Sequence, residues 1–253
     1  MKLEVIPGDI TQQNVGAIVV NIFEGVTTPK GATGTVDVAL DGTISKLVEE
    51  GEITGKLHQL TVIHTLGKMI PSRVLVVGLG PKADFTSDTA RSAIAESCRH
   101  LHKLGVKSIS TIVHGSGIGG LDDEQAGQAM AEGIILGTYK FDKYKSAKGN
   151  TEIEHVNIVE NDSEKMTAIK RGVFKGTVIA ESVNICRDMA NEPANSLTPT
   201  QMTEVALLAA RESDLELQLM EKPEMEKLGM GAFLGVAQGS MEPPKMIILR
   251  FVG

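Results

Sequence analysis

Residues 74–113 read VLVVGLGPKADFTSDTARSAIAESCRHLHKLGVKSISTIV, and this stretch decides the fold class. Its two ends, Val74 to Val77 and Ser108 to Val113, are short runs rich in Val and Ile, which is typical of strands. Between them, Thr86 to Leu104 is predicted to form a helix, because apolar or small side chains recur every three or four residues and Gly105 follows as a stop. A strand, a helix and a second strand in this order are typical of a layered α/β domain.

The same alternation continues on both sides of this stretch. Further strands are predicted at Leu3 to Ile6, Ala17 to Ile22, Leu60 to His64 and Ile153 to Val159, and further helices at Thr35 to Glu49 and Asp123 to Phe141. Strands interleaved with helices predict an α/β domain with a mostly parallel sheet. The polar stretch from Lys143 to Asn150 marks the expected end of this domain, near residue 150.

A long helix is predicted after this domain, from Ser163 to about Met189, because its apolar and small side chains form one stripe. The pair Glu192-Pro193 ends it, since proline disfavours helix at the residue before it. The next helix has a clear start: Thr198 suits the N-cap, Pro199 the first helical position, and Gln201 the reciprocal position of a capping box.

Two more strands, Leu215 to Leu219 and Lys245 to Phe251, are predicted near the end of the chain, with a short helix ending at Gly229 between them. Ile247 to Leu249 is a continuous apolar run, which is typical of a strand buried on both faces. Domains rarely finish on such a strand, so we expect the second domain to be incomplete in this chain. We also expect exposed apolar surface around Lys245 to Phe251 and a tendency to associate, because unpaired core strands template aggregation.

The composition excludes several classes of protein. The chain has 253 residues, 42% of them hydrophobic and 23% charged, so disorder, collagen and coiled coil do not describe it. A net charge of -7 argues against sequence-independent binding of nucleic acid or anionic membranes. The start MKLEVIPGDI is neither a signal nor a transit peptide, and no apolar run is long enough to span a bilayer. Cys98 and Cys186 form no CxxC pair, which favours a reducing, cytoplasmic location.

Two glycine-rich loops follow predicted strands. Gly78 to Ala83 matches the G-x-G-x-x-A pattern of dinucleotide sites, but no acid lies about 20 residues further on and the next helix begins late, so an ordinary strand-exit loop is favoured. His114 to Gly120 can form an anion-binding nest of backbone amides or a crossover that needs positive φ angles.

The residue types bring no catalytic constellation together. The histidines include no HExxH pair, and the sequence has no G-x-S-x-G elbow and no P-loop. A zinc site built from this chain alone is therefore not expected.

Several blocks resemble one enzyme family. They are Ala131 to Ser146, Val183 to Asn195 with Leu197 to Pro199, Leu228 to Phe233, Gln238 to Ser240 and Glu242 to Pro244. In order and spacing they resemble the leucyl aminopeptidases, the cytosol aminopeptidase family, in the N-terminal domain and at the junction with the peptidase domain. The resemblance covers the whole chain and is most specific after residue 130.

This resemblance implies a two-domain, metal-dependent exopeptidase that removes N-terminal residues, often leucine, from peptides in the cytoplasm. Members of the family hold two divalent ions, typically zinc, manganese or magnesium, in the C-terminal domain and assemble as hexamers. The ions activate a shared water and polarise the scissile carbonyl. The parent protein is thus expected to act on peptides, with neither membrane nor nucleic acid as a partner.

The family's metal ligands are a lysine, several aspartates and a glutamate, and its first metal-site motif leads into Phe-Asp-Ser/Thr-Gly-Gly. That motif is absent from this sequence. We therefore assign no catalytic, metal-binding or cofactor-binding residue, expect no metal in this chain and predict that it is inactive alone. Asn191, Glu192 and Asn195 are interpreted as a helix end and turn, and Arg187 and Asp188 as surface ion-pair formers.

The resemblance also implies a macro-like N-terminal domain. Gly8 to Thr11 and Ala17 to Asn21 resemble the opening of an ADP-ribose-binding macro module, in which the aspartate contacts adenine and a loop like Ser116 to Gly120 holds phosphates. Glu24 lies where it would repel an anion, so we expect ligand binding to be lost. A stand-alone module for ADP-ribose or a related nucleotide is the alternative, and a DNA-contacting role is the weakest.

The expected organisation has three parts. Residues 1–150 form the macro-like domain, residues 151–190 a linker strand and long helix, and residues 191–253 the beginning of a truncated α/β peptidase domain. The predicted function is that of the N-terminal portion of a leucyl aminopeptidase.

Overall fold

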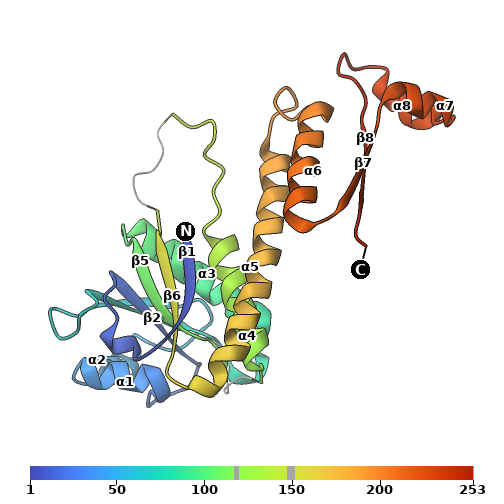
Figure 1. Ribbon diagram of the computed structural model, residues 1–253. Coiled ribbons are helices and arrows are strands. Elements are labelled where there is room, and N and C mark those ends of the chain that lie inside the picture. Colours follow the sequence, from blue (N-terminus) through green and yellow to red (C-terminus); the bar gives the residue numbers. More distant parts are fainter. Residues whose placement is uncertain (117–119, 147–151, 253) are drawn as a thin grey trace. The chain divides into compact units, whose positions relative to one another are not determined.

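Figure 1 shows the computed structural model, which describes residues 1–116, 120–146 and 152–252. The chain divides into two compact units, Met1–Ile185 and Cys186–Gly253. The first unit contains, in order, β1 (Lys2–Pro7), η1 (Ile10–Gln12), β2 (Ala17–Ile22), α1 (Gly31–Ala39), α2 (Thr43–Glu49), β3 (Leu60–His64), β4 (Arg73–Gly78), η2 (Lys82–Asp84), α3 (Ser87–Lys103), β5 (Ser108–Ile112), α4 (Asp123–Gly137), β6 (His155–Glu160) and most of α5 (Ser163–Asn191).

The first unit is built on a six-stranded sheet in the order β1-β6-β5-β2-β4-β3. All neighbouring strands run parallel except β3, which is antiparallel to β4 at the sheet edge. The predicted α/β class with a mostly parallel sheet is therefore confirmed. The helices cover both faces of the sheet, with α1 and α2 on one side and α3, α4 and α5 on the other (Figure 1).

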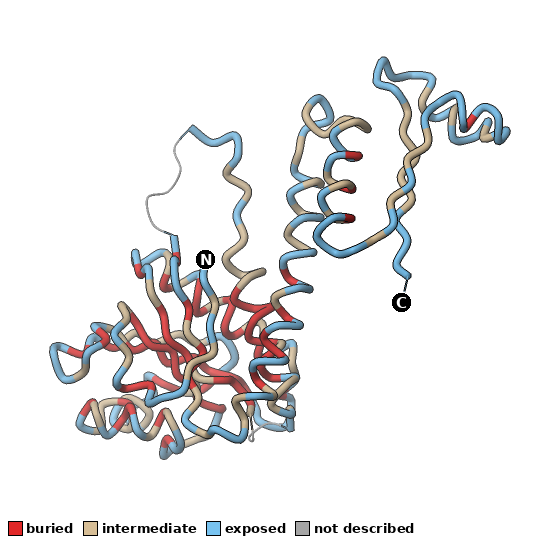
Figure 2. Tube along the Cα trace, in the orientation of Figure 1, coloured by how far each residue is buried: buried red, intermediate tan, exposed pale blue. Residues whose placement is uncertain are grey.

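The two central strands separate two hydrophobic cores. On β2, Ile18 and Val20 point into the core under α1 and α2, whereas Ala17 and Val19 point into the core under α3 and α4, and all four are fully buried. This two-sided burial explains the continuous apolar runs in the sequence. Figure 2 shows that the buried residues of the first unit are concentrated on the sheet and its adjacent helices.

The helices α3, α4 and α5 pack closely because glycines replace side chains at their contacts. A Cβ on Gly133 of α4 would lie 2.4 Å from the carbonyl oxygen of Arg91 on α3, and one on Gly172 of α5 would lie 2.0 Å from that of Glu124 on α4. These backbones therefore approach closer than any side chain permits.

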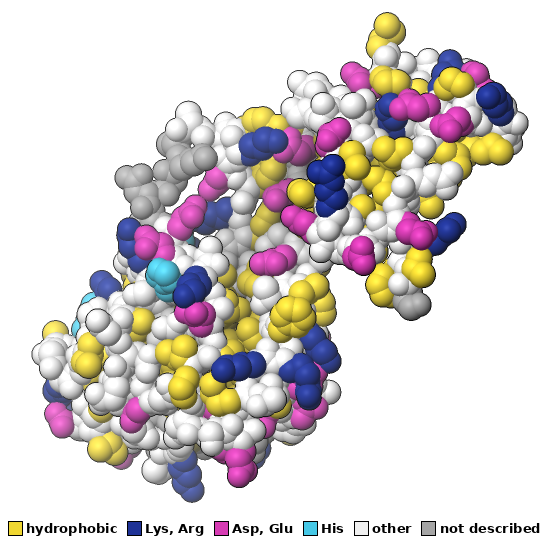
Figure 3. Space-filling view, viewed as in Figure 1, with side chains coloured by type: hydrophobic (Ala, Val, Ile, Leu, Met, Phe, Trp, Pro, Cys, Tyr) yellow, Lys and Arg dark blue, Asp and Glu magenta, His cyan; other side chains and the backbone are white. Residues whose placement is uncertain are grey.

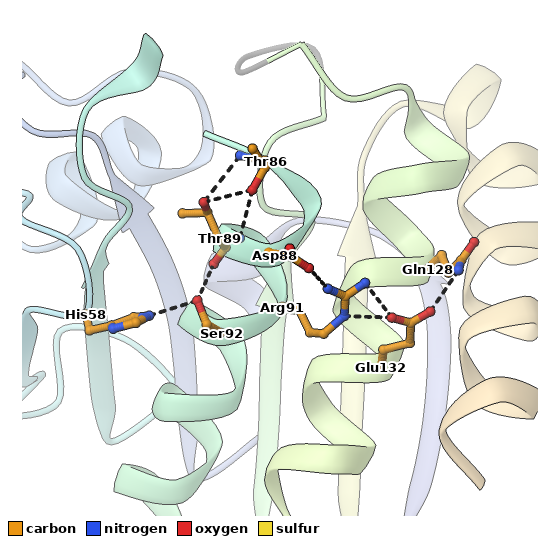
Figure 4. A network of polar contacts seen from close by, with 8 residues as sticks. All are labelled: His58, Thr86, Asp88, Thr89, Arg91, Ser92, Gln128 and Glu132. Carbon is orange, nitrogen blue, oxygen red and sulfur yellow. Dashed lines mark hydrogen bonds and ion pairs between the residues drawn. The ribbon is translucent and has the colours of Figure 1, made fainter. Parts of the chain in front are cut away.

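A polar network also links α3 to α4 (Figure 4). The buried Glu132 carboxylate accepts from Arg91 Nε at 2.6 Å and from Gln128 Nε2 at 2.8 Å, and Arg91 also pairs with Asp88. Because every polar atom of Glu132 has a partner, the buried charge is compensated and fixes the register of the two helices.

Two helix predictions were wrong in detail. The single helix expected at Thr35 to Glu49 is two helices, α1 and α2. Asp41 and Gly42 have φ angles of 55° and 79°, which are not helical, so the chain turns between the two helices. Asp37 caps the second helix by accepting from the backbone N–H of Ile44 at 2.7 Å. The helix expected to reach Phe141 ends at Gly137, with Thr138 as its C-cap.

The second unit is smaller and thinly packed. It contains the end of α5, then α6 (Pro199–Ser213), β7 (Glu216–Met220), α7 (Lys222–Lys227), α8 (Gly231–Ala237) and β8 (Met246–Arg250). β7 and β8 form an antiparallel two-stranded sheet. Among its described residues, 186–252, the buried side chains are Thr203, Ala206, Ala210 and Met225. The helix α8 was not predicted.

The apolar surface expected around Lys245 to Phe251 is present in the structure. Ile247 and Ile248 are partly exposed, and Leu249 and Phe251 are exposed, because β7 is the only strand paired with β8 among the described residues. Hydrophobic side chains accordingly reach the surface of this unit in Figure 3.

Thr198 caps α6 as predicted, but its hydroxyl contacts the Gln201 side chain, so no reciprocal capping box forms. Among the described residues, no helix combines the length and apolar character needed to cross a membrane.

Candidate functional site

The carboxyl ends of β2 and β5 are the place in the first unit where this fold type would hold a ligand. The two strands are parallel neighbours. From β2 the chain passes to α1 on one face of the sheet, and from β5 it passes to α4 on the other face. Open α/β sheets bind ligands where the connections diverge in this way. Two residues singled out in the sequence analysis lie near this point. Asn21 is on β2 and ends a segment of the macro-like resemblance, and His114 follows β5 and begins the second glycine-rich loop.

Asn21 and His114 contact one another. The Asn21 Nδ2 atom lies 2.8 Å from His114 Nδ1, and because an amide nitrogen only donates, Nδ1 is the acceptor and Nε2 carries the proton. His114 is fully buried, and its Nε2 has no hydrogen-bond partner in the described part of the chain. Asn21 also accepts at its backbone oxygen from Thr33 Oγ1 at 2.7 Å.

The surroundings of His114 keep it neutral. Burial lowers the pKa of the imidazole to about 3, because the charged form loses its hydration. A neutral ring whose Nδ1 lone pair already accepts from Asn21 cannot act as a general base near pH 7. The pair therefore ties the end of β2 to the loop after β5 and holds no catalytic proton.

Aromatic side chains fill the space beside this pair. Phe23 and Phe85 are buried and meet edge to face, with ring centroids 5.2 Å apart. A Cβ on Gly115, which has a φ of 88°, would lie 2.2 Å from the Phe85 ring. The strand ends are thus packed with the protein's own side chains.

The other residues of the macro-like resemblance are occupied locally or exposed. Asp9 caps η1, since its Oδ1 accepts from the Thr11 backbone N–H and hydroxyl, each at 2.8 Å. The Ser116 hydroxyl donates to Asp123, and Glu24 is exposed. The centre of the loop from Ser116 to Gly120, residues 117–119, lies outside the described residues.

The Gly78 to Ala83 segment is a strand-exit loop. A Cβ on Gly78 would lie 2.0 Å from the Lys56 carbonyl oxygen, and the Gly80 N–H donates to the Gly55 carbonyl at 2.9 Å. The glycines therefore admit the chain's own backbone at the place where a dinucleotide fold admits pyrophosphate. The helix α3 begins only at Ser87, as the late start in the sequence predicted.

The junction residues form a helix end and a turn. The Asn191 side chain donates to the Arg187 carbonyl at 2.8 Å in the last turn of α5, and the N–H of Glu192 donates to the Asp188 carbonyl at 3.1 Å. The N–H groups of Ser196 and Leu197 both donate to the Pro193 carbonyl, which forms the turn before α6.

Sequence reasoning missed two contacts that the structure reveals. The Asn21–His114 pair joins residues 93 positions apart, and Glu132 is buried on α4 against Arg91. A weak signal for the second was available, because Glu132 stands among small and apolar residues on the buried stripe of its helix.

The donor set for a metal is also absent from the described residues. Within residues 1–116, 120–146 and 152–252, no three His, Cys, Asp or Glu side chains are grouped closely enough to hold a metal ion. These residues do not fit the two-metal site of an aminopeptidase, so no metal-dependent step is assigned to them.

Two segments of the chain, one in each half, match the two domains of one protein family. Residues 19–148 match the N-terminal domain of the cytosol aminopeptidase family, and residues 184–253 match its catalytic domain. Probable cytosol aminopeptidases of Alkaliphilus oremlandii (strain OhILAs) and Alkaliphilus metalliredigens (strain QYMF) are 34% and 33% identical over all of this chain. The chain spans about half, 51%, of the length of each.

Solved structures agree in fold. A mutant of tomato leucine aminopeptidase superposes with a TM-score of 0.79 at 20% identity, over 98% of this chain and 50% of that one. The bottromycin maturation enzyme BotP in complex with Mn superposes with a TM-score of 0.74 at 25% identity, over 94% of this chain and 45% of that one. The matches do not support the alternative of a stand-alone ADP-ribose module. The chain belongs to the cytosol aminopeptidase family, as an N-terminal portion that comprises the N-terminal domain and part of the catalytic domain.

Proposed function

We propose that this chain is the N-terminal portion of a metal-dependent leucyl aminopeptidase, which as a whole protein removes N-terminal residues from peptides. The observation that carries the proposal is the match of both halves of the chain, in order, to the two domains of one aminopeptidase family. A relative of similar fold is described with Mn, which supports a divalent metal, zinc or manganese, in the whole protein.

We further propose that the 253-residue chain is inactive by itself. The Phe-Asp-Ser/Thr-Gly-Gly motif of the family is absent from its sequence, and the described residues group no metal donors. Its contribution to the whole enzyme is then structural: a folded N-terminal domain, the helix α5 and the first strands and helices of the catalytic domain.

The proposed division follows the predicted boundaries: 1–150 for the macro-like domain, 151–190 for the linker and 191–253 for the start of the peptidase domain. The extents of the two family matches support it, because neither match covers residues 149–183. A homohexameric whole protein in the cytoplasm completes the proposal, with support for the location from the names of the cytosol aminopeptidase relatives.

A chimera tests the function. Residues 1–253 are joined to the remaining half of the Alkaliphilus oremlandii relative, and release of leucine from a chromogenic leucine amide is measured with and without added Mn²⁺ or Zn²⁺. Metal-stimulated release by the chimera is expected, with none from residues 1–253 alone.

Two outcomes would contradict the proposal. A chimera that folds cooperatively but stays inactive, beside an active full-length relative, would show that this chain is no functional aminopeptidase portion. Robust metal-stimulated release by residues 1–253 alone would show that the chain is active without the remaining half.

A further inference from the structure

The helix α5 carries apolar side chains on two opposite sides. One side packs against α4, and its buried residues are Ile169, Gly172, Val173, Gly176 and Ala180. The other side carries Phe174, Val178 and Ile185, which are 69%, 49% and 48% exposed. Their spacings of four and seven residues place these three side chains along one line of the helix, which we call the exposed stripe. Figure 2 shows buried and exposed residues alternating along α5.

The packing of the first unit does not explain the exposed stripe. A helix on the surface of a domain needs one apolar side, and its opposite side is normally polar. Single exposed apolar residues are common on protein surfaces, but several that lie together mark an interaction site. Phe174 contributes most to the stripe, because an aromatic ring is the largest apolar surface that a single residue of this helix can bury.

The family matches indicate which part of the protein covers the stripe. The match to the catalytic domain begins at residue 184, inside α5, so this helix runs without a break from the first unit into the catalytic portion. Ile185 belongs to that match, and Phe174 lies less than three helical turns before it. The probable cytosol aminopeptidases are about twice as long as this chain, so each carries a further segment of similar length outside the match.

We propose that the exposed stripe is the surface on which the remaining half of the catalytic domain docks in the whole protein. This inference rests on the proposed function, since it requires a whole protein with both domains. Apolar side chains of the remaining half contact Phe174, Val178 and Ile185. Glu181 lies on the same side of the helix, so the docked surface also brings a basic or amide side chain to it, because a carboxylate that loses water needs a partner.

The helix α5 then has a second role besides linking the two domains. Its buried side belongs to the core of the first unit, and its exposed stripe belongs to the contact with the catalytic domain. One rigid helix held from both sides fixes the orientation of the two domains in the whole protein.

Cysteine labelling tests this contact without relying on activity. In a Cys186→Ser background, Val178→Cys is expected to react with a maleimide at least about tenfold more slowly in the Alkaliphilus oremlandii chimera than in the 253-residue chain, because the docked half excludes the reagent. Val38→Cys on α1, at a residue that is 78% exposed, is the matched control and should react equally fast in both proteins. The remaining cysteine of this chain, Cys98, is buried.

A cross-link identifies what lies on the stripe. The chimera with Phe174→p-benzoylphenylalanine is prepared with ordinary and with heavy isotopes, and the two preparations are refolded together and irradiated. Cross-links from α5 to the remaining half within one isotope label are expected. Cross-links that mix the two labels would place a second copy on the stripe, and cross-links to residues 193–252 would place the second unit there. Either result would overturn the proposal.

The stability of the 253-residue chain gives a test that needs no chimera. Phe174→Lys is expected to change its melting temperature by less than about 2 °C, because the Phe174 side chain is mostly in water. Val173→Lys, one residue away on the buried side, is expected to lower it by more than about 10 °C, since it buries a charge. Equal losses in the two variants would mean that the stripe already packs within this chain, which would overturn the proposal.

The labelling result separates this inference from the proposed function. A cooperatively folded chimera in which Val178→Cys reacts as fast as in the 253-residue chain overturns the docking surface, whether or not that chimera releases leucine. A chimera that protects Val178→Cys but stays inactive supports the docking surface and contradicts the proposed function.

Discussion

At the scale of single residues, His114 couples the stability of the first unit to pH. Its pKa is lowered to about 3 in the folded chain, whereas a histidine in the unfolded chain titrates near 6.5. Between these values the unfolded state binds more protons, so stability falls as the pH drops through this window, by at most about 1.4 kcal/mol per pH unit from this residue. Urea unfolding between pH 4.5 and 7.5 is expected to show a shallower pH dependence for His114→Gln, with the exposed His64→Gln as control. An unchanged slope in His114→Gln would refute this account.

The sequence marked His114 and Asn21 separately but not as a pair. Each stands at the end of a Val/Ile-rich run, which places both at the carboxyl edge of a parallel sheet. Their contact depends on β5 lying beside β2 although β3 and β4 come between them in the sequence. Strand order of this kind arises from long-range packing, and no local pattern records it.

At the scale of elements, the close contact of α4 and α5 depends on Gly172. Alanine in a helix is normally more stable than glycine by roughly 0.5–1 kcal/mol. At Gly172, however, the added Cβ would lie 2.0 Å from the Glu124 backbone, so Gly172→Ala is expected to destabilise the chain by about 1–3 kcal/mol. Gly235→Ala in α8, where no atom lies within 4 Å of the new Cβ, is the matched control and should be neutral or stabilising. Equal unfolding free energies of the two variants would contradict the packing argument.

The elements themselves were mostly predictable, because their signals are local. β2 and β3 have the predicted bounds, and α3 begins directly after the predicted Thr86. The failure at residues 35–49 has a physical cause. Val36, Leu40 and Ile44 keep a helical spacing across the break, since α1 and α2 cover the same core, and only the Asp41-Gly42 pair signals the turn. The exposure of Leu249 agrees with the apolar surface expected around Lys245 to Phe251, since β7 is the only strand that pairs with β8 among the described residues.

At the scale of the whole molecule, the two units are expected to differ sharply in stability. The first unit holds both hydrophobic cores, whereas the second buries four side chains, two of them alanines, and its two-stranded sheet leaves both outer strand edges without a neighbouring strand among the described residues. Burial supplies most of the free energy that offsets chain entropy, and two-stranded sheets are marginal in water.

Hydrogen exchange followed by mass spectrometry measures this difference directly. Backbone amides of β2 and β4 are expected to exchange only through global unfolding of the first unit, while those of β7, β8 and α6 exchange orders of magnitude faster through local opening. The Alkaliphilus oremlandii chimera described above provides the comparison, because strands supplied by the remaining half of the catalytic domain would protect β8. If β7 and β8 are protected as strongly as β2 in the 253-residue chain, the second unit gains its stability from interactions other than its own thin core. If they become protected only in the chimera, the first part of the catalytic domain is completed by the segments that the relatives carry beyond it.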